Sequence, residues 1–289
     1  MKGEAMALGS ALCWAVAVIL FRSAPSLSPF AMNLFKNVFA LGLFGLTLLV
    51  TGGGLGEHPT AEWAQLALSG VLGIAVADTL FFAALQRLGP SRLAIVECSY
   101  APSVVLLSAI FLGEPVGLPL VAGAGLVAGG VVLGSLERRP LGEVDRKGAL
   151  LGVSAILSLA TGILLARPIL AHSALLEVTL IRLLAGVGGQ LLYAALHRRP
   201  AEDFAAFRSR AAWPALIPAS ILSTWLAMLL WLGGFKYTAA SVAAVLNQTT
   251  TGWVLLLARV VLGEPLTPRR LGGALLAASG ALLVLLTRR

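Results

Sequence analysis

Charged residues are scarce in this chain of 289 residues: they make up 12% of it, about half of the roughly 25% that is usual in soluble domains. A soluble fold with so few charges would have too little polar surface to cover it. Cysteine is also scarce, and Cys13 and Cys98 both lie inside apolar runs, so they indicate no disulfide framework. The composition therefore excludes an ordinary soluble enzyme, a disordered chain and a disulfide-rich secreted module.

The common motifs of cofactor and catalytic sites are also missing. The sequence has no phosphate-binding glycine loop, no dinucleotide-binding fingerprint and no serine–histidine–aspartate arrangement. Its three histidines have no metal-ligand partner at a useful spacing. We therefore expect no cofactor, no bound metal and no enzymatic activity. The net charge of +8 does not indicate nucleic acid, because Lys and Arg lie mostly at the ends of apolar runs, beside lipid head groups.

What the sequence has instead is apolar residues, which make up 58% of the chain and give a mean hydropathy of +0.92. About 20 apolar residues in a helix cross the hydrocarbon core of a bilayer, because the helix rises about 1.5 Å per residue. The runs of this length predict ten membrane-spanning helices. They cover residues 5–21, 29–50, 64–87, 91–112, 117–136, 148–168, 175–196, 213–236, 241–262 and 268–287.

The two halves of the chain resemble each other. Residues 91–139 align without a gap to residues 241–289, and 18 of the 49 aligned positions are identical. The identities include the segment Leu-Gly-Glu-Pro at 112–115, which apolar bias alone does not readily produce. We therefore predict a duplicated unit of five helices, with the first repeat in residues 1–140 and the second in residues 141–289.

An odd number of spans in each repeat has a topological consequence. The second repeat begins on the opposite face of the membrane and is inverted relative to the first. The expected fold is an all-α membrane protein of ten transmembrane helices, arranged as two inverted five-helix repeats (5+5). Inverted repeats around a site near the midplane are common among transporters.

This pattern resembles the EamA-type transporters of the drug/metabolite transporter superfamily. The resemblance rests on the five-plus-five spans, on Leu-Gly-Glu-Pro at the end of the fourth and ninth helices, and on glycine-rich fifth and tenth helices. It implies secondary transport of small metabolites such as amino acids, by export or exchange and often driven by a proton gradient. It also implies a central cavity lined by the first four helices of each half. We expect an integral, multi-pass protein of the bacterial inner membrane.

Polar residues inside the spans are the first candidates for a substrate site. A charge at the centre of a spanning helix costs about 2.5–3.5 kcal/mol on insertion scales, so it should face a cavity or a partner. Counted along the helices, the candidates form two polar layers that bracket the midplane, about 10 Å apart. The predicted substrate-binding residues are Lys36, Asp78, Glu97, Tyr100, Arg182, Asn247, Gln248, Trp14 and Trp225.

Two of these residues are carboxylates with a predicted role in coupling. Glu97 or Asp78 would bind a proton or a substrate amine, since titratable groups in such sites are often functional. In the structural alternative, Lys36 forms a permanent ion pair with one of the two carboxylates, and neither partner gains or loses a proton. Two other functions stay open: an uncoupled facilitator or channel of the same fold, and an integral membrane enzyme that uses the two carboxylates.

The expected partners are a small-molecule substrate and the lipid bilayer, and not nucleic acid. Glycines spaced four apart, at Gly125–Gly129 and Gly130–Gly134, permit close helix approach, either within a monomer or at the seam of a homodimer. The glutamates of the repeated segment, Glu114 and Glu264, are expected in interfacial water at tight turns. Positive charges in the connections favour termini outside the cell, whereas the family resemblance favours cytoplasmic termini, so the orientation stays open.

Overall fold

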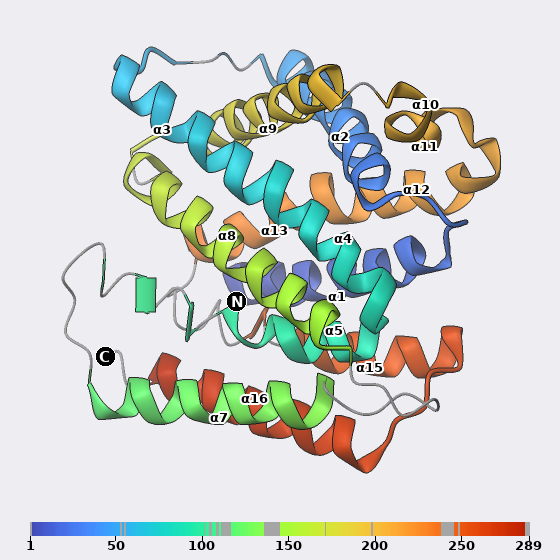
Figure 1. The fold of residues 1–289 in the computed structure, drawn as a ribbon. Coiled ribbons are helices and arrows are strands. Elements are labelled where there is room, and N and C mark those ends of the chain that lie inside the picture. The colour runs from blue at the N-terminus through green and yellow to red at the C-terminus, as the bar shows by residue number, and fades with distance from the viewer. Residues whose placement is uncertain are drawn as a thin grey trace.

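The computed structural model of the protein is helical throughout (Figure 1). It describes residues 2–52, 54, 56–100, 102–103, 106–107, 110, 117–135, 145–170, 172–197, 199–237, 246–247 and 249–286. Within these ranges no residue belongs to a β-strand. The all-α class predicted from the sequence is therefore confirmed.

The helices follow most of the predicted runs. The first half contains α1 (Lys2–Ser23), α2 (Pro29–Thr51), α3 (Thr60–Gly70), η1 (Val71–Val76), α4 (Ala77–Leu88), α5 (Pro90–Glu97) and α7 (Leu118–Ser135). The second half contains α8 (Arg146–Leu170), α9 (Leu175–His197), α10 (Pro200–Asp203), α11 (Ala205–Arg208), η2 (Arg210–Ala212), α12 (Trp213–Ser220), η3 (Ile221–Leu226), α13 (Ala227–Tyr237), α15 (Thr249–Leu262) and α16 (Pro268–Leu286). The segments α3–η1–α4 and α12–η3–α13 each form one long helix.

Six helical segments among the described residues are long and apolar enough to cross a membrane. Two more apolar helices are shorter, at Val121–Gly134 and Thr249–Leu262. Large apolar side chains point outward, with Leu49, Leu118 and Val260 exposed by 81%, 82% and 72%, as lipid-facing residues are. The protein is an integral, multi-pass membrane protein. The count of ten spans is not established, because the runs at 91–112 and 241–262 lie partly outside the described residues.

The ends of α2 show how local sequence fixes a span. Ser28 accepts a hydrogen bond from the backbone N–H of Ala31 at 3.1 Å, and Pro29 takes the first helical position, where its missing N–H costs nothing. The helix ends at Gly52, which adopts φ +64°. Glycine accepts this left-handed conformation without a steric penalty, so the helix stops there.

The fourth predicted helix is not continuous, which corrects the expected run at 91–112. α5 ends at Glu97, and Cys98 and Ser99 form a turn whose N–H groups donate to carbonyls three residues back. Pro102 explains the position of the break. It lacks an N–H, and its ring clashes with the carbonyl four residues earlier, which is that of Cys98. The break places Glu97 at a helix end.

The two halves pack against each other reciprocally. α1 packs on α13 and α15, and α8, the first helix of the second half, packs on α4 and α5. Likewise α3 contacts α9, and its counterpart α12 contacts α2. A two-fold relation produces such reciprocal pairs, since each contact between the halves then occurs twice with the roles exchanged. The arrangement fits a two-repeat architecture.

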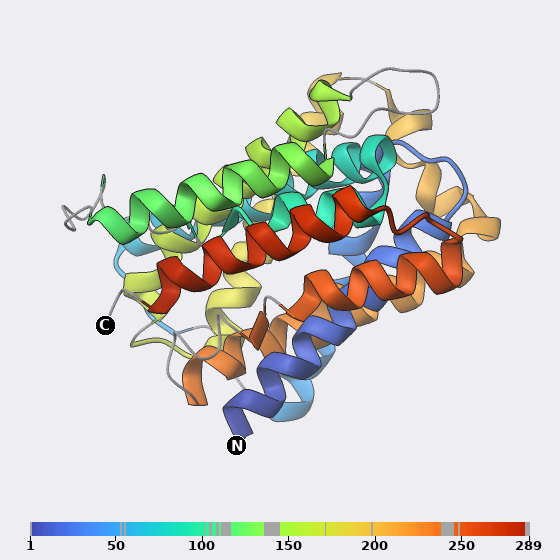
Figure 2. The same ribbon diagram turned by 90° about the horizontal axis from the view of Figure 1, so that it is seen from below.

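The helices that end each half, α7 and α16, lie side by side at the edge of the bundle in both ribbon views (Figure 1 and Figure 2). Their backbones touch at glycines. A methyl group on Gly130 would lie 2.6 Å from the Gly273 carbonyl oxygen, and one on Gly273 would lie 2.7 Å from the Gly134 Cα. The glycine spacing at 130–134 therefore serves packing within one chain.

Gly130→Ala is expected to destabilise the protein, whereas Gly125→Ala is not. The added methyl group at position 130 meets backbone atoms of α16, and overpacking of this kind costs about 1–3 kcal/mol. Nothing lies within 4 Å of the same methyl group at position 125, so this variant is a matched control. Thermal unfolding in detergent tests the pair, and equal unfolding temperatures would contradict the packing.

The carboxylate of Glu264 is not surrounded by interfacial water, as the sequence led us to expect. Its side chain is 19% exposed, and it accepts hydrogen bonds from the Ser91 N–H at 3.4 Å and from Arg270 at 3.5 Å. The N–H of Ser91 belongs to the first turn of α5, whose unpaired donors attract a carboxylate. A glutamate of the second half thus holds the start of α5 in the first half.

Candidate functional site

A π-helical turn interrupts the third long helix of each half at the same place. η1 spans Val71–Val76 and η3 spans Ile221–Leu226, an offset of 150 residues, which is also the offset of the sequence repeat. π-helical turns are rare and are frequent at functional sites, because they leave backbone groups without their usual partners. The residues around these two equivalent turns are therefore candidates for a functional site.

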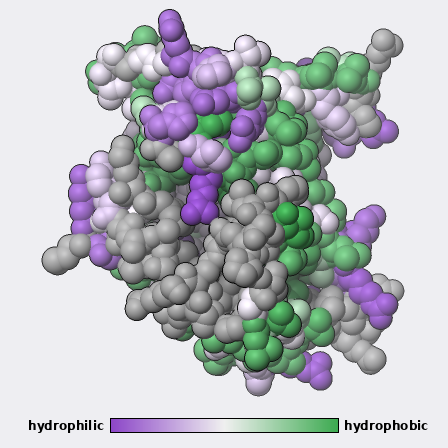
Figure 3. Space-filling model, turned by 90° about the vertical axis from the view of Figure 1, so that its left-hand side faces the viewer, coloured by the Kyte–Doolittle hydropathy of each residue, from purple (hydrophilic) through white to green (hydrophobic). Residues whose placement is uncertain are grey.

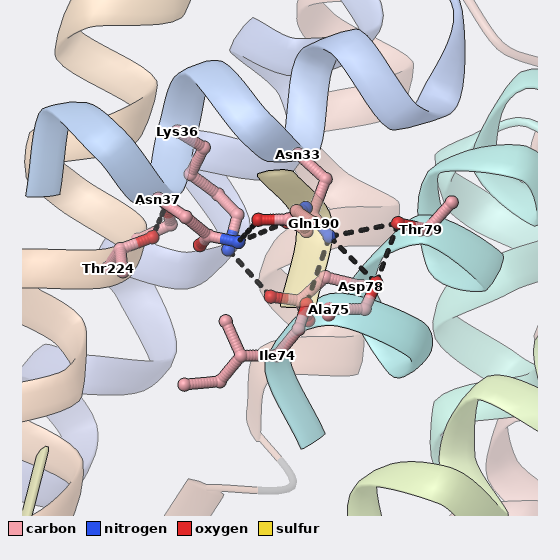
Figure 4. Close-up of polar contacts among 10 residues, drawn as sticks. Asn33, Lys36, Asn37, Ile74, Ala75, Asp78, Thr79, Gln190 and Thr224 are labelled. Atoms are coloured by element: carbon pink, nitrogen blue, oxygen red, sulfur yellow. Dashed lines mark hydrogen bonds and ion pairs between the residues drawn. The ribbon is translucent and has the colours of Figure 1, made fainter. Parts of the chain in front are cut away.

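Asn33 on α2 donates hydrogen bonds to two carbonyls of η1. Its side-chain nitrogen lies 2.9 Å from the carbonyl oxygen of Ile74 and 3.1 Å from that of Ala75, and 3.0 Å from the hydroxyl of Thr79 (Figure 4). Asn33 is fully buried. One buried amide therefore joins α2 to the irregular turn, and its own polar atoms find the partners that burial requires.

One turn further along α2, Lys36 forms an ion pair with Asp78. The ammonium nitrogen lies 2.6 Å from a carboxylate oxygen, and the two side chains are 3% and 20% exposed (Figure 4). Asp78 stands in the first turn of α4, directly after η1. Of the two pairings that the sequence allowed for Lys36, this is the one formed.

A chain of amides continues from this pair into the second half. The Asn37 side-chain nitrogen donates to Asn33 at 2.8 Å and to Gln190 on α9 at 3.1 Å (Figure 4). The Asn37 oxygen and the Gln190 nitrogen are buried without a hydrogen-bond partner in the described part of the chain. Buried polar atoms are normally paired, so both atoms have capacity for a further polar group.

Arg182 brings a cation from the second half to the same region. It lies on α9 and is 4% exposed. Gly73 in η1 makes room for the guanidinium, since a methyl group there would lie 3.1 Å from one of its nitrogens. The Arg182 Nε is buried without a hydrogen-bond partner among the described residues.

Glu97 lies apart from this ion pair. Its carboxylate accepts a hydrogen bond from the indole nitrogen of Trp14 at 3.1 Å, and it forms no ion pair in the part of the chain that the structure describes. The Trp14 ring lies against Phe81, with centroids 5.4 Å apart. Glu97, Trp14 and Tyr100 are all partly exposed.

The remaining predicted residues are less closely connected to these groups. Trp225 in η3 donates its indole N–H to the hydroxyl of Thr47 at 3.0 Å and packs among α2 side chains. The side-chain nitrogen of Asn247 is buried without a partner among the described residues. Gln248 lies outside the described residues.

Sequence reasoning missed Asn33, Asn37 and Gln190. Their signal was available, since two asparagines four residues apart share one face of a helix, and three buried amides in apolar runs need partners. The two carboxylates of the enzyme alternative, Asp78 and Glu97, have different partners. No cluster of three or more His, Cys, Asp or Glu residues among the described ranges has the geometry to hold a metal ion.

Comparisons with known proteins agree with this architecture. A crystal structure of a protein with 18% sequence identity superposes with a TM-score of 0.71, over 99% of this chain and 96% of the other. At this identity the likeness shows the fold alone. A search of curated proteins finds no match. The model of the EamA-like transporter family matches twice, over residues 1–136 and 146–286, and so accounts for nearly the whole sequence. The chain belongs to the EamA-like transporter family and is a membrane transporter of the drug/metabolite transporter superfamily.

Proposed function

We propose that the protein is a secondary transporter that moves a small polar metabolite, such as an amino acid, by alternating access. The two repeats, residues 1–140 and 141–289, rock around the buried polar groups that lie between them. Transport is coupled to protons. We place the protein in the bacterial inner membrane, as a monomer or homodimer that needs no cofactor.

The observation that carries this proposal is that charged side chains from both halves lie beside the same irregular turn, η1. Lys36 and Asp78 come from the first half and Arg182 from the second. Charges inside membrane helices are costly and are kept where they bind substrates or ions. A zwitterion between them would meet a carboxylate and a guanidinium whose Nε has no other partner among the described residues.

Glu97 is the better candidate for the coupling proton. Its partner is Trp14, a neutral donor, so Glu97 can gain or lose a proton without breaking an ion pair. Protonation of Asp78 would break its pair with Lys36 at 2.6 Å. The first half alone carries these carboxylates, since the positions 150 residues later are Met228 and Asn247.

A transport assay separates this function from an uncoupled facilitator of the same fold. Purified protein in liposomes is tested with radiolabelled L-amino acids, with and without an imposed pH gradient. We expect uptake of at least one amino acid above that of protein-free liposomes, accelerated by the gradient. In Arg182→Ala this uptake is expected to fall to background. Uptake that ignores the gradient would indicate a facilitator, and wild-type uptake by Arg182→Ala would remove Arg182 from the site.

A further inference from the structure

A second cluster of titratable groups lies at one end of the helices, away from the buried ion pair. His58 belongs to the connection between α2 and α3, outside the helices. Its ring nitrogens contact two carboxylates: Nδ1 lies 2.8 Å from Glu62 and Nε2 lies 3.0 Å from Glu177. Glu62 is in the first turn of α3 and Glu177 in the first turn of α9. The imidazole therefore joins the two halves of the protein.

The chemistry of this bridge requires a proton. A neutral imidazole has one N–H donor and one acceptor, whereas an ionised carboxylate only accepts hydrogen bonds. Only the imidazolium can donate to both glutamates at once. Loss of one proton leaves a ring nitrogen facing a carboxylate oxygen with no hydrogen between them. These two atoms then repel each other, and one of the two contacts is lost.

The groups around His58 reinforce the link, and a pocket beside them is open to solvent. Glu177 also accepts a hydrogen bond from the backbone N–H of Gly56, in the same connection as His58. His172, between α8 and α9, lies 3.7 Å from Glu62, and its side chain is 58% exposed. A pocket of about 410 Å³ opens beside the cluster, and its lining includes Glu57. Protons can therefore reach the bridge from water.

This end of the molecule is where α3 starts and where α8 connects to α9, at the left of Figure 1. Hydrophilic side chains gather in the upper part of the same face (Figure 3). The imidazole also packs against the ring of Trp63, with the two rings nearly perpendicular and their centroids 5.8 Å apart. The side chain of His58 is consequently only 6% exposed although it lies in a surface connection.

We propose that His58 is a proton-controlled latch, which ties the α2–α3 connection of the first half to α9 of the second half and holds this face of the molecule closed while it is protonated. The latch goes beyond the transport function proposed above. It is a property of the chain's own conformation and is measured without any substrate.

The direction of the pH dependence follows from the groups on His58. The hydrogen bond to Glu62 raises the His58 pKa above its ordinary value of 6.5, burial opposes this, and the contacts with Glu177 add to it. A raised pKa means that the closed state is fully stabilised below about pH 6.5 and loses this stabilisation as the pH rises through the raised value. The latch therefore closes in acid and opens in base.

The distance between two spin labels tests the latch. Cysteines replace Gly54, where an added side chain meets nothing within 4 Å, and Ala174, in a background of Cys13→Ala and Cys98→Ala. We expect a short, narrow distance distribution near pH 5.5 and a longer, broader one near pH 8.5, with a midpoint above about 6.5. In His58→Gln the distribution is expected not to change with pH.

Two further variants make the test decisive. His172→Gln is the matched control, because it removes the neighbouring histidine, and it should titrate like the parent protein. Glu177→Gln should lower the midpoint, and this keeps the proposal testable where His58→Gln fails to fold. A parent distance that does not change with pH would overturn the latch, as would loss of the titration in His172→Gln. Neither result bears on whether the protein transports amino acids.

Discussion

Glu97→Gln is expected to abolish uptake driven by a pH gradient and to spare the exchange of substrate across the membrane. Glutamine keeps the size of the side chain and can still accept the hydrogen bond that Trp14 donates at 3.1 Å, but it cannot carry a proton. Net proton-driven movement therefore stops, whereas exchange requires no proton to cross. The measurement is uptake into liposomes with a pH gradient, beside counterflow without one, using the radiolabelled amino acid that gave the strongest wild-type signal.

The control for this variant is Glu202→Gln, which removes a carboxylate whose side chain is 57% exposed in a connection. It should behave like the wild type in both assays. Gradient-driven uptake by Glu97→Gln at the wild-type rate would remove Glu97 from the coupling role. Loss of exchange together with uptake would assign Glu97 to substrate binding instead.

Lys36→Met is expected to destabilise the protein by up to about 3–5 kcal/mol, because it leaves the partly buried Asp78 carboxylate without its countercharge. Adding Asp78→Leu should recover most of this loss, since an apolar pair of similar volume needs no compensation for burial. The double variant is nevertheless expected to transport at background level. The contribution of this pair to stability would then be distinguished from its contribution to transport.

Unfolding in detergent and uptake into liposomes measure the two effects. The matched control is Arg199→Ala, which breaks an ion pair with Glu202 whose side chains are 65% and 57% exposed; such pairs contribute about 0–1 kcal/mol. Wild-type stability of Lys36→Met would contradict the energetic role of the pair. Wild-type uptake by the double variant would show that the pair takes no part in transport.

The fold was predictable because it depends on patterns along the chain. Apolar runs of about 20 residues predict spanning helices, and the alignment of 91–139 with 241–289 predicts a repeat that the family comparison also covers. Pairing of Lys36 with a carboxylate was predictable for a similar reason, since a lone charge in a membrane helix is too costly to leave unpaired.

The rest depends on contacts between segments that are distant in sequence. The π-helical turns leave no mark in the hydrophobic pattern, and the hydrogen bonds of Asn33 to the carbonyls of Ile74 and Ala75 join positions 41 and 42 residues apart. His58 and Glu177 are 119 residues apart, and His58 stands in a connection, where periodicity gives no information. The partner of Glu264, the backbone N–H of Ser91, belongs to the start of a helix in the other half. The sequence does not show that these two segments meet, so Glu264 was expected in water.

The central claim is that the second half is an inverted copy of the first, with the polar groups between them. Corresponding connections must then lie on opposite faces of the membrane. Ser26, between α1 and α2, and Ala174, between α8 and α9, are both exposed and suit single cysteine substitutions in a background without Cys13 and Cys98. A membrane-impermeant thiol reagent added to intact cells should label one of the two sites, and the other only after the membrane is opened. Labelling of both sites from the same face would contradict the inverted repeat and the account built on it.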